Sequence, residues 1–305
     1  GPQGPPGAAL PSSVNLIYAG NFNDNAVSVI DGNNHSVIAT VPVGIGPSSL
    51  GVNPATDRIY VSNGGDITVS VIDGNTNTMI ATVPVAGNPA GLGVNTATNR
   101  IYVTNVAENS VSVIDGDTNT VIATVPVSGV GPVSVGVNPI TNRIFVANQA
   151  SANVTVISGI SNTVIATIPV GFVPLGVGVN LTTNRIYVTN LGDSTVSVIS
   201  GLSNAVITTV TVGSTPSGID VNSITNRIYV VNADTVSVID GISDTVIATI
   251  AGFSLPNDIK ANPLTNGIYV ANVTGNTVSV IDGNSNTVIA AVPVGSGPNS
   301  IGVNS

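Results

Sequence analysis

Short aliphatic runs alternate with polar, turn-forming residues along this chain, and the alternation repeats. The segment Val69–Gly74 returns with small changes in seven copies, at a period of about 42 residues that is typical of solenoids, propellers and arrays. The other copies begin at Val27, Val111, Val154, Val196, Val236 and Val278. Ile101–Asn105 recurs in step with them, and so do variants of Gly93–Asn95. The repeat therefore has to be assigned to an architecture before any single residue is interpreted.

Each repeat predicts four β-strands. In the unit from Pro89 to Val127 they are expected at Ala90–Asn95, Arg100–Asn105, Val111–Asp115 and Thr120–Val127, because Val, Ile, Thr and Tyr dominate these segments. The middle two are almost continuously apolar rather than alternating, as in a sheet that is covered on both faces. No segment has the periodicity of a helix. Four strands per repeat, packed between neighbouring sheets, predict the blades of a β-propeller.

The turn residues support this assignment. A glycine stands in the same turn of every copy, where we expect a positive φ. The glycines are Gly32, Gly74, Gly116, Gly159, Gly201, Gly241 and Gly283. The fourth strand carries proline in five copies, and proline cannot donate to a ladder, so this strand is expected at the outer edge. These prolines are Pro42, Pro84, Pro126, Pro169 and Pro293.

The two ends of the chain predict how the ring closes. The repeats open on a second strand, Ile17–Asn21, and finish on a first strand, Asn299–Asn304. Each would be an unpaired edge alone, so we expect them to pair. The prediction is an all-β, seven-bladed propeller with four antiparallel strands per blade, closed by the C-terminal strand joining the first blade.

The segments Ile101–Asn105 and Ile186–Asn190, both IYVTN, resemble the signature of YVTN β-propeller repeat proteins. The resemblance covers residues 14–305, with mild departures at Ala19–Gly20 and Phe145–Ala147. It implies a propeller like those of surface-layer proteins and of periplasmic or secreted binding proteins, and so an extracellular or cell-surface location. The family fixes no catalytic residues, so the resemblance assigns none.

The first residues form a separate segment. Gly1–Gly7 has glycine at every third position with proline between, the pattern of a collagen triple helix, in which only glycine fits the axis. A proline-rich linker is the alternative interpretation. We expect a collagen-like stub at residues 1–7, a linker at 8–13 and the propeller at 14–305. The stub predicts self-association into a trimer or a filament.

Charge excludes some partners. Only 7% of residues are charged, and the net charge is −9 with six basic residues. Nucleic acids and anionic membranes both require a Lys/Arg patch, so neither is an expected partner. No apolar run approaches the ~18 residues that span a bilayer, so membrane insertion is not expected.

Residues suited to catalysis are scarce. The chain has one histidine, His35, one glutamate, Glu108, and no cysteine. Both residues fall in expected turns, so we predict no catalytic, cofactor or metal site. Arginines that begin second strands face aspartates that end third strands, so surface ion pairs are expected within blades. The predicted pairs are Arg58–Asp73, Arg100–Asp115 and Arg227–Asp240.

One group of residues breaks the repeat. The glycine of Gly93–Asn95 becomes Asp220 and Lys260 in the sixth and seventh copies, and Asp258 lies two residues before Lys260. These positions fall on innermost strands, where propellers bind ligands, so the three residues are either a small polar site on the axis or a local salt bridge. The sixth copy also has a shortened loop at Ala233–Thr235.

Three functions remain open on these grounds. The first is a non-enzymatic structural or adhesive surface protein, a propeller head on a collagen-like stalk or in a filament, with a cell-surface glycan or protein as its external partner. The second is a propeller that binds a sugar or peptide in the periplasm or outside the cell. The third is a lyase or hydrolase, which is supported only by analogy with other proteins of the same fold. The scarcity of catalytic residues favours the first, and the sequence predicts that the protein is not an enzyme.

Overall fold

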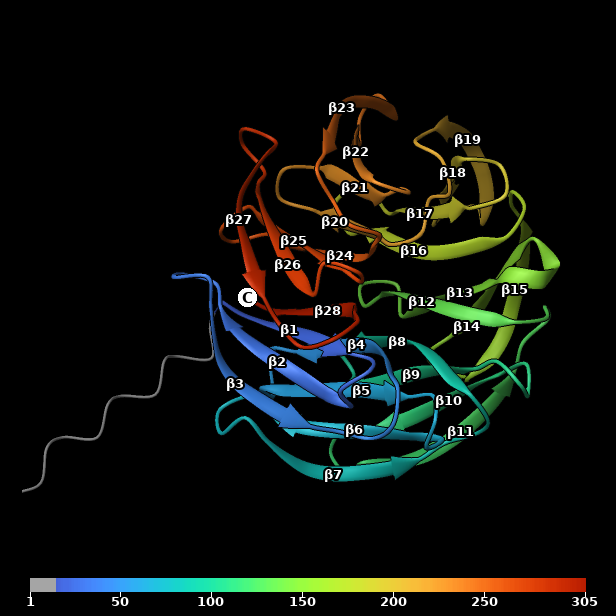
Figure 1. Ribbon diagram of the computed structural model, residues 1–305. Coiled ribbons are helices and arrows are strands. Elements are labelled where there is room, and N and C mark those ends of the chain that lie inside the picture. Colours follow the sequence, from blue (N-terminus) through green and yellow to red (C-terminus); the bar gives the residue numbers. More distant parts are fainter. Residues whose placement is uncertain (1–14) are drawn as a thin grey trace, which may run out of the picture.

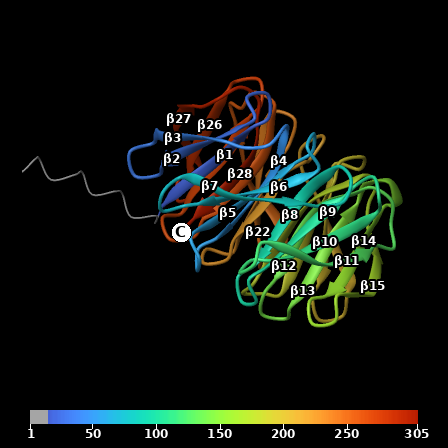
Figure 2. The same cartoon turned by 90° about the horizontal axis from the view of Figure 1, so that it is seen from below.

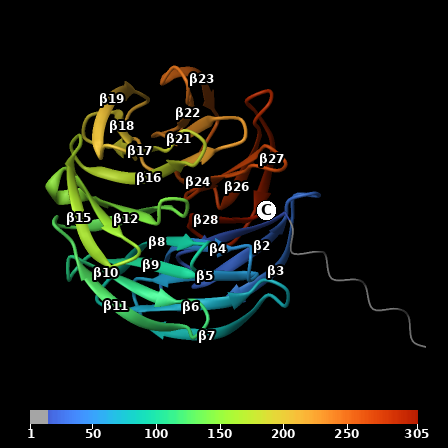
Figure 3. The same cartoon turned by 180° about the vertical axis from the view of Figure 1, so that it is seen from behind.

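The computed structural model describes residues 15–305, which form seven four-stranded antiparallel sheets arranged in a ring (Figure 1). We call the sheets blades 1 to 7, and the strands of each blade a to d from the axis outward. Inner strands such as β4, β8 and β12 gather around the centre, and β7, β11 and β15 lie at the rim (Figure 3). The seven-bladed propeller predicted from the repeat is confirmed.

The strands are given blade by blade in the order a to d. Blades 1 to 3 are β28 (Pro298–Asn304), β1 (Leu16–Asn21), β2 (Ala26–Asp31), β3 (Ser36–Pro42); β4 (Pro47–Asn53), β5 (Arg58–Asn63), β6 (Thr68–Asp73), β7 (Thr78–Pro84); β8 (Pro89–Asn95), β9 (Arg100–Asn105), β10 (Ser110–Asp115), β11 (Thr120–Pro126). Blades 4 and 5 are β12 (Pro132–Asn138), β13 (Arg143–Asn148), β14 (Asn153–Ser158), β15 (Thr163–Pro169); β16 (Pro174–Asn180), β17 (Arg185–Asn190), β18 (Thr195–Ser200), β19 (Ala205–Thr211). Blades 6 and 7 are β20 (Ile219–Asn222), β21 (Arg227–Val231), β22 (Thr235–Asp240), β23 (Thr245–Ala251); β24 (Pro256–Asn262), β25 (Gly267–Asn272), β26 (Thr277–Asp282), β27 (Thr287–Pro293). A single 3₁₀ turn, η1 (Gln149–Ser151), is the helical element of the described part, and no helix there is long and apolar enough to cross a membrane.

The ring closes through its last strand. Strand β28 pairs antiparallel with β1, with Tyr18 opposite Gly302 and Ala19 opposite Ile301, and the two strands lie side by side (Figures 1 and 2). The predicted closure is confirmed. The stub at 1–7, the linker at 8–13 and residue 14 lie outside the described residues.

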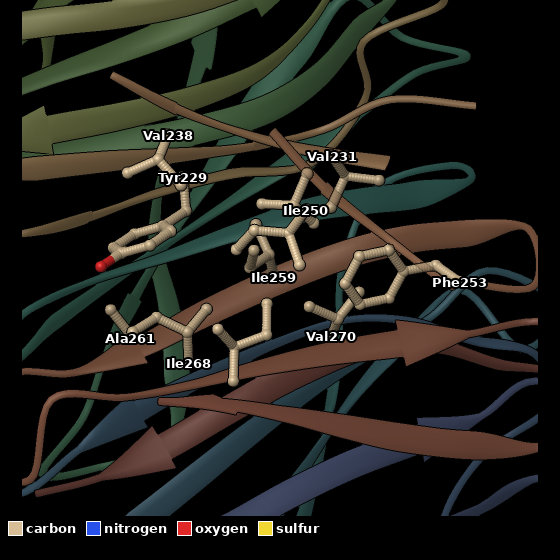
Figure 4. Packing of buried hydrophobic residues seen from close by; sticks show 11 residues of the cluster. Tyr229, Val231, Val238, Ile250, Phe253, Ile259, Ala261, Ile268 and Val270 are labelled. Atoms are coloured by element: carbon tan, nitrogen blue, oxygen red, sulfur yellow. The ribbon is translucent and has the colours of Figure 1, made fainter. Parts of the chain in front are cut away.

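The core lies between adjacent blades rather than inside one of them. Between blades 6 and 7, Tyr229 and Val238 pack with Ile259 and Ile268 of the next blade (Figure 4). Strands b and c are buried almost throughout, which accounts for their continuous apolar sequence. Strand d forms the outer edge, as its prolines predicted.

A buried amide holds each blade together internally. The asparagine that ends the IYVTN segment donates from Nδ2 to a strand c hydroxyl in the same blade, as Asn63 does to Ser70 at 2.9 Å and Asn190 to Ser197 at 2.9 Å. The same amide–hydroxyl contact forms in all seven blades, and in blade 3 the hydroxyl of Ser112 donates to the amide oxygen of Asn105. Because a buried amide needs a partner, this asparagine has a structural role in every copy.

A second set of amides links neighbouring blades. The asparagine at the end of each strand a donates from Nδ2 to the side chain at a turn of the next blade, over 2.6–3.0 Å. The pairs are Asn53–Asn99, Asn95–Asn142, Asn138–Asn184, Asn180–Asn226, Asn222–Asn266, Asn262–Asn15 and Asn304–Asp57. These seven links form a closed girdle around the ring.

The turn glycine between strands c and d has a different cause from the one predicted. No member of that set has a positive φ; the left-handed residue comes three positions later, as at Asn77 with φ 54°. A Cβ on Gly74 would lie 3.0 Å from the carbonyl oxygen of Asp57 and 3.1 Å from Oη of Tyr18 in the preceding blade. The position needs glycine because neighbouring atoms crowd it, so the prediction of a positive φ is wrong.

The predicted ion pairs inside blades are confirmed in one case. The register places Arg58, Arg100 and Arg227 opposite their expected aspartates. Of these three, Arg100 alone forms the ion pair, with Asp115. In the described part of the chain, Arg58 and Arg227 form no such pair.

Three arginines instead reach the next blade. Nη1 of Arg58 donates to the carbonyl of Gly116 at 2.5 Å, and Nη1 of Arg143 donates to that of Gly201 at 2.7 Å. Arg185 pairs with Asp244 of blade 6 at 2.6 Å. The extended arginine side chain spans the gap between blades, so register within a blade does not determine its partner.

Candidate functional site

The axis of the propeller is hollow. A cavity of about 240 Å³ opens at the face that carries the b–c and d–a loops, which we call the b–c face, and a cavity of about 290 Å³ opens at the opposite c–d face. Serine and asparagine side chains line the first mouth, among them Ser134, Ser217, Asn257 and Asn299, whereas aliphatic side chains dominate the second. Lys260 borders both cavities, so its side chain lies where they meet.

Three charged residues converge at this point. Nζ of Lys260 lies 3.8 Å from Oδ1 of Asp220 and 4.0 Å from Oδ1 of Asp258. The other oxygens of the aspartates accept backbone N–H groups of the next blade, Asp220 from Ala261 and Asp258 from Ile301, both at 2.8 Å. The carboxylates are therefore fixed, whereas the ammonium is farther from each than a normal hydrogen bond. We call Asp220, Asp258 and Lys260 the axial cluster.

The regular blades show why the axial cluster needs special room. In them the position of Asp220 is glycine, and a Cβ on Gly51 would lie 2.3 Å from Cδ2 of Leu92 and 2.8 Å from Cγ2 of Val94 in the next blade. In blade 7 the position of Val94 is occupied by Ala261, which leaves space for the Asp220 side chain. Every other blade has valine there: Val52, Val94, Val137, Val179, Val221 and Val303. Sequence reasoning missed this paired change, although Ala261 was its visible signal.

The surroundings shift the titration of the cluster. Burial raises the pKa of Asp220 above its usual value, and the nearby Lys260 ammonium opposes part of that rise. For Lys260 burial lowers the pKa, but Asp258 and Asp220 together outweigh it and raise the pKa. Lys260 is therefore charged at neutral pH.

A second hollow lies on the b–c face beside the channel mouth. It has a volume of about 490 Å³ and is walled by Leu191 of blade 5, Leu255 and Val273 of blade 7, and Phe22 of blade 1, with Ala233 of blade 6 among them. Phe22 and Leu255 are 48% and 57% exposed. We call this the apolar hollow. It shares three residues with the channel mouth, Ser217, Asn257 and Asn299, so the two cavities adjoin.

Blade 6 makes room for the apolar hollow. Its b–c loop has two residues, Ala233 and Asp234, between Asn232 and Thr235, whereas blade 5 has four there, Leu191–Ser194. Strand a of blade 6 also starts late, at Ile219, and Gly218 donates instead to the carbonyl of Asn257 at 3.1 Å. The missing loop leaves a depression between the taller loops of its neighbours. Sequence reasoning saw the shortened loop but not the cavity, which needs four blades in place.

The remaining titratable residues lie elsewhere. His35 is in the c–d turn of blade 1, and Glu108 is in the b–c loop of blade 3. Burial raises the pKa of Tyr269 to about 12. Burial also raises the pKa values of Tyr60, Tyr102 and Tyr229 above the usual range of tyrosine. No group of three or more His, Cys, Asp and Glu residues within 15–305 could hold a metal ion. The axial cluster is thus the set of charged side chains that borders the cavities.

Comparison with known proteins supports the fold. No family model matches the chain, and no curated protein matches it either. Among solved structures, a functionally unknown protein from Desulfotomaculum acetoxidans DSM 771 has a TM-score of 0.84 at 13% identity, covering 95% of this chain and 98% of its own. Hydrazine synthase of Kuenenia stuttgartiensis has a TM-score of 0.74 at 18% identity, covering 83% and 88%. Dihydro-heme d1 dehydrogenase NirN in complex with DHE has a TM-score of 0.69 at 15% identity, covering 96% and 68%.

These comparisons correct two of our predictions. Two of the similar structures are enzymes by their titles, hydrazine synthase and a dihydro-heme d1 dehydrogenase, so the assignment to a non-enzymatic structural or adhesive surface protein is wrong. The exclusion of an enzyme is wrong for the same reason. It rested on the scarcity of His, Glu and Cys, and such a count takes no account of what a propeller can hold in its cavities. At 18% and 15% identity the likeness itself shows the fold alone.

Proposed function

We propose that this chain is a ligand-binding β-propeller that holds a small amphipathic molecule at its b–c face. The apolar part of the ligand lies in the apolar hollow, against Leu255, Val273 and Phe22. Its polar end reaches the channel mouth at Ser217, Asn257 and Asn299, above the axial cluster. The observation that carries the proposal is the coincidence, in blades 6 and 7, of the shortened loop and the axial cluster.

The coincidence matters because a ring of repeats offers seven equivalent places for each departure. The loop deletion lies in blade 6, Asp220 lies in blade 6, and Asp258, Lys260 and Ala261 lie in blade 7. Cavities that adjoin and together supply an apolar wall with a few convergent polar groups have the composition of small-molecule sites. Random divergence of the repeats would not favour neighbouring positions for these departures.

The lining defines the chemistry of the ligand. Aliphatic walls and one half-exposed phenyl ring suit a hydrocarbon or ring system better than a sugar, which would need more hydrogen-bonding groups in the hollow. Hydroxyl and amide groups at the mouth suit a neutral hydroxyl, carbonyl or amide. A side chain of a peptide fits the same description, which keeps the peptide-binding alternative within this proposal.

Two point variants with the same chemistry test the site. Leu255 has φ 50° and Val173 has φ 56°, and each precedes the proline that opens strand a of its blade. Asn88 occupies this position in blade 3 with φ 52°, so asparagine is compatible with the local backbone in both places. Leu255 walls the apolar hollow, whereas Val173 does not.

We expect the fluorescent probe anilinonaphthalene sulfonate to bind the wild-type protein, and Leu255→Asn to weaken binding by roughly tenfold through lost apolar contact. Val173→Asn should bind as the wild type does. A loop graft that replaces Ala233–Asp234 with the Leu-Gly-Asp-Ser loop of blade 5 should fill the hollow and abolish binding. Equal binding by all four proteins, each checked for folding by circular dichroism, would contradict the proposal.

The repeat family and the location belong to this proposal as well. The IYVTN segments support assignment of the repeats to the YVTN type and, through that resemblance, an extracellular or cell-surface location. Fractionation of the source cells with an antibody to the propeller tests the location, and recovery in the cytosol would contradict it. Self-association through residues 1–7 remains a further proposal, tested by sedimentation of the chain with and without them.

A further inference from the structure

The c–d face, opposite the proposed ligand site, carries an arc of exposed aliphatic side chains. They stand on the tips of the a–b and c–d loops of blades 4 to 7 and are 67–86% exposed. The residues are Ile140, Ile160, Leu202, Ile224, Ile242 and Leu264. We call these six the aliphatic arc.

The other half of the same face is polar at the same positions. Where blades 4, 5 and 6 have Ile160, Leu202 and Ile242, blades 1, 2 and 3 have Asn33, Asn75 and Asp117. The turn itself is the same in both halves. Asn77 donates to the carbonyl of Asp73 at 2.8 Å in blade 2, and Asn162 donates to that of Ser158 at 2.8 Å in blade 4. Folding of the turn therefore does not require an aliphatic residue.

Acidic residues are unevenly distributed on this face, because the c–d turns of blades 6 and 7 carry Asp240, Asp244 and Asp282 whereas those of blades 4 and 5 carry no aspartate. The a–b and c–d loops of blades 4 and 5, with the strand ends beside them, contain no acidic residue. Five aspartates stand at the corresponding places of blades 1 to 3: Asp31, Asp57, Asp73, Asp115 and Asp117. The part of the face on blades 4 and 5 is thus suited to apolar contact, and the part on blades 1 to 3 is suited to solvent.

We propose that the aliphatic arc is an interface with a second copy of this chain. At roughly 60–120 Å² for each exposed aliphatic side chain, the value implied by its transfer free energy, six provide much of the about 800 Å² that each partner contributes to a stable interface. Tips at the regular spacing of the blades can interdigitate with an identical row related by a two-fold axis, as an isologous interface requires. A pairing centred on blade 5 places the loops of blade 5, which have no carboxylates, opposite each other at the two-fold axis.

The composition of the arc favours a protein partner over a lipid surface. Side chains that anchor proteins at a bilayer interface are enriched in Trp and Tyr and are accompanied by Lys and Arg. The chain has no tryptophan, its tyrosines are buried in strand b, and its net charge is −9. Complete overlap of two faces would bring aspartates of blades 1 to 3 together, so the copies meet along their arcs, and salt should strengthen the pairing by screening these charges.

The polar blades supply the test variant. Asparagine stands at the c–d tip in blades 1, 2 and 7, as Asn33, Asn75 and Asn284, so the triple variant Ile160→Asn, Leu202→Asn and Ile242→Asn copies a sequence that this fold already accepts. The matched control replaces Val130 and Phe172, which are 55% and 68% exposed on the b–c face, with asparagine.

Sedimentation velocity of the full chain gives the readout. We expect a concentration-dependent dimer at tens of micromolar protein, tighter at high salt, in the wild type and in the control. The triple variant should sediment as a monomer, with at least a tenfold weaker association. The same results should hold without residues 1–7, which separates this interface from the N-terminal segment, and probe binding at the b–c face should not change.

A wild type that remains monomeric at all concentrations, or a triple variant as dimeric as the wild type, would overturn the proposal. Binding to neutral phosphatidylcholine vesicles by a monomeric wild type, lost in the triple variant, would assign the arc to lipid instead and would also overturn it.

Discussion

Blades 2 to 5 and blades 6 and 7 share one framework but differ at the axis and at one loop. Both groups contain the buried amide–hydroxyl pair, as in Asn63–Ser70 and Asn232–Ser237, and the girdle of side-chain hydrogen bonds runs through all of them. Only blades 6 and 7 carry charge on strand a, and only blade 6 has the two-residue b–c loop. The asparagine that links each strand a to the next blade is the same in every copy, whereas the departures at the axis and in the b–c loop lie beside cavities.

The comparison also explains how charge can be placed on a crowded axis. In a regular blade the glycine of strand a lies beneath two aliphatic side chains of the next blade, and a larger residue would collide with them. Blade 6 accommodates Asp220 because blade 7 gives up a valine at Ala261, and the backbone N–H of Ala261 then binds the carboxylate at 2.8 Å. The departure is therefore a coordinated change in two blades.

The largest effect should come from opening the ring. Deleting residues 298–305 removes β28 and leaves β1 as an unpaired inner edge. Because a propeller buries its core between adjacent blades, blade 1 loses its inner packing and we expect loss of cooperative unfolding, measured by thermal denaturation in circular dichroism. Removal of residues 1–7 is the control and should leave the transition unchanged. A deletion variant with an unaltered transition would show that the ring does not depend on this strand.

Exchanging axial residues between the regular and irregular blades should change the free energy of unfolding in opposite directions. Gly51→Asp places a carboxylate against Leu92 and Val94 with no partner, so we expect a loss of about 3–5 kcal/mol in the free energy of unfolding. The reverse change, Asp220→Gly, Asp258→Ser, Lys260→Gly and Ala261→Val, restores the regular pattern and should be neutral or stabilising by about 1–4 kcal/mol. Urea denaturation measures both.

The same restored variant separates structure from function. If the axial cluster binds the polar end of a ligand, the restored protein gains stability but loses affinity, the usual relation at a site that is maintained for function. A restored protein that is strongly destabilised and binds the probe normally would instead make the cluster a structural salt bridge.

Replacing the buried asparagine should lower the free energy of unfolding equally in the two groups of blades. Asn63→Ala in blade 2 and Asn232→Ala in blade 6 each remove the donor to a buried serine, so each should cost about 1–3 kcal/mol. Equal losses are expected, because both asparagines are buried and their bonds to serine measure 2.9 and 3.0 Å. A much smaller loss in blade 6 would show that its shortened loop has already loosened the pair.

The sequence predicted those features that recur in every copy. Apolar runs at a fixed period indicated the strands, and the orphan strands at the two ends indicated closure. It did not predict partners that lie one blade away, because Arg58 faces Asp73 in the register yet donates to Gly116. The reason for the turn glycines was predicted wrongly on related grounds. One of the atoms that would crowd a Cβ on Gly74 is Oη of Tyr18, which lies in the preceding blade.

The site was predictable in part. Asp220 and Lys260 were visible because they interrupt a repeated glycine, and the loop deletion was visible as a change in spacing. The apolar hollow was not, because Phe22, Leu191 and Leu255 come from separate blades and meet only when the ring closes. A cavity that is formed by tertiary closure leaves no local pattern in the sequence.

The smallest expected change in stability comes from removing the ion pair of blade 3. Blades 4 and 5 have no aspartate at the position of Asp115 and serve as the comparison. The hydrogen bond from Arg100 lowers the pKa of Asp115 to about 2, with backbone N–H groups adding to the shift. A carboxyl whose pKa is lower in the folded state stabilises the fold above its unfolded pKa of about 4, and this stabilisation is lost as the pH falls towards 2.

Blades 4 and 5 have Ser158 and Ser200 at this position, so Asp115→Ser copies a residue that the turn accepts. We expect the variant to be less stable by about 0.2–1 kcal/mol at pH 6 and equal to the wild type near pH 2, measured by urea denaturation across this range. A difference that persists unchanged at low pH would mean that Asp115 stabilises the fold through contacts that do not depend on its ionisation.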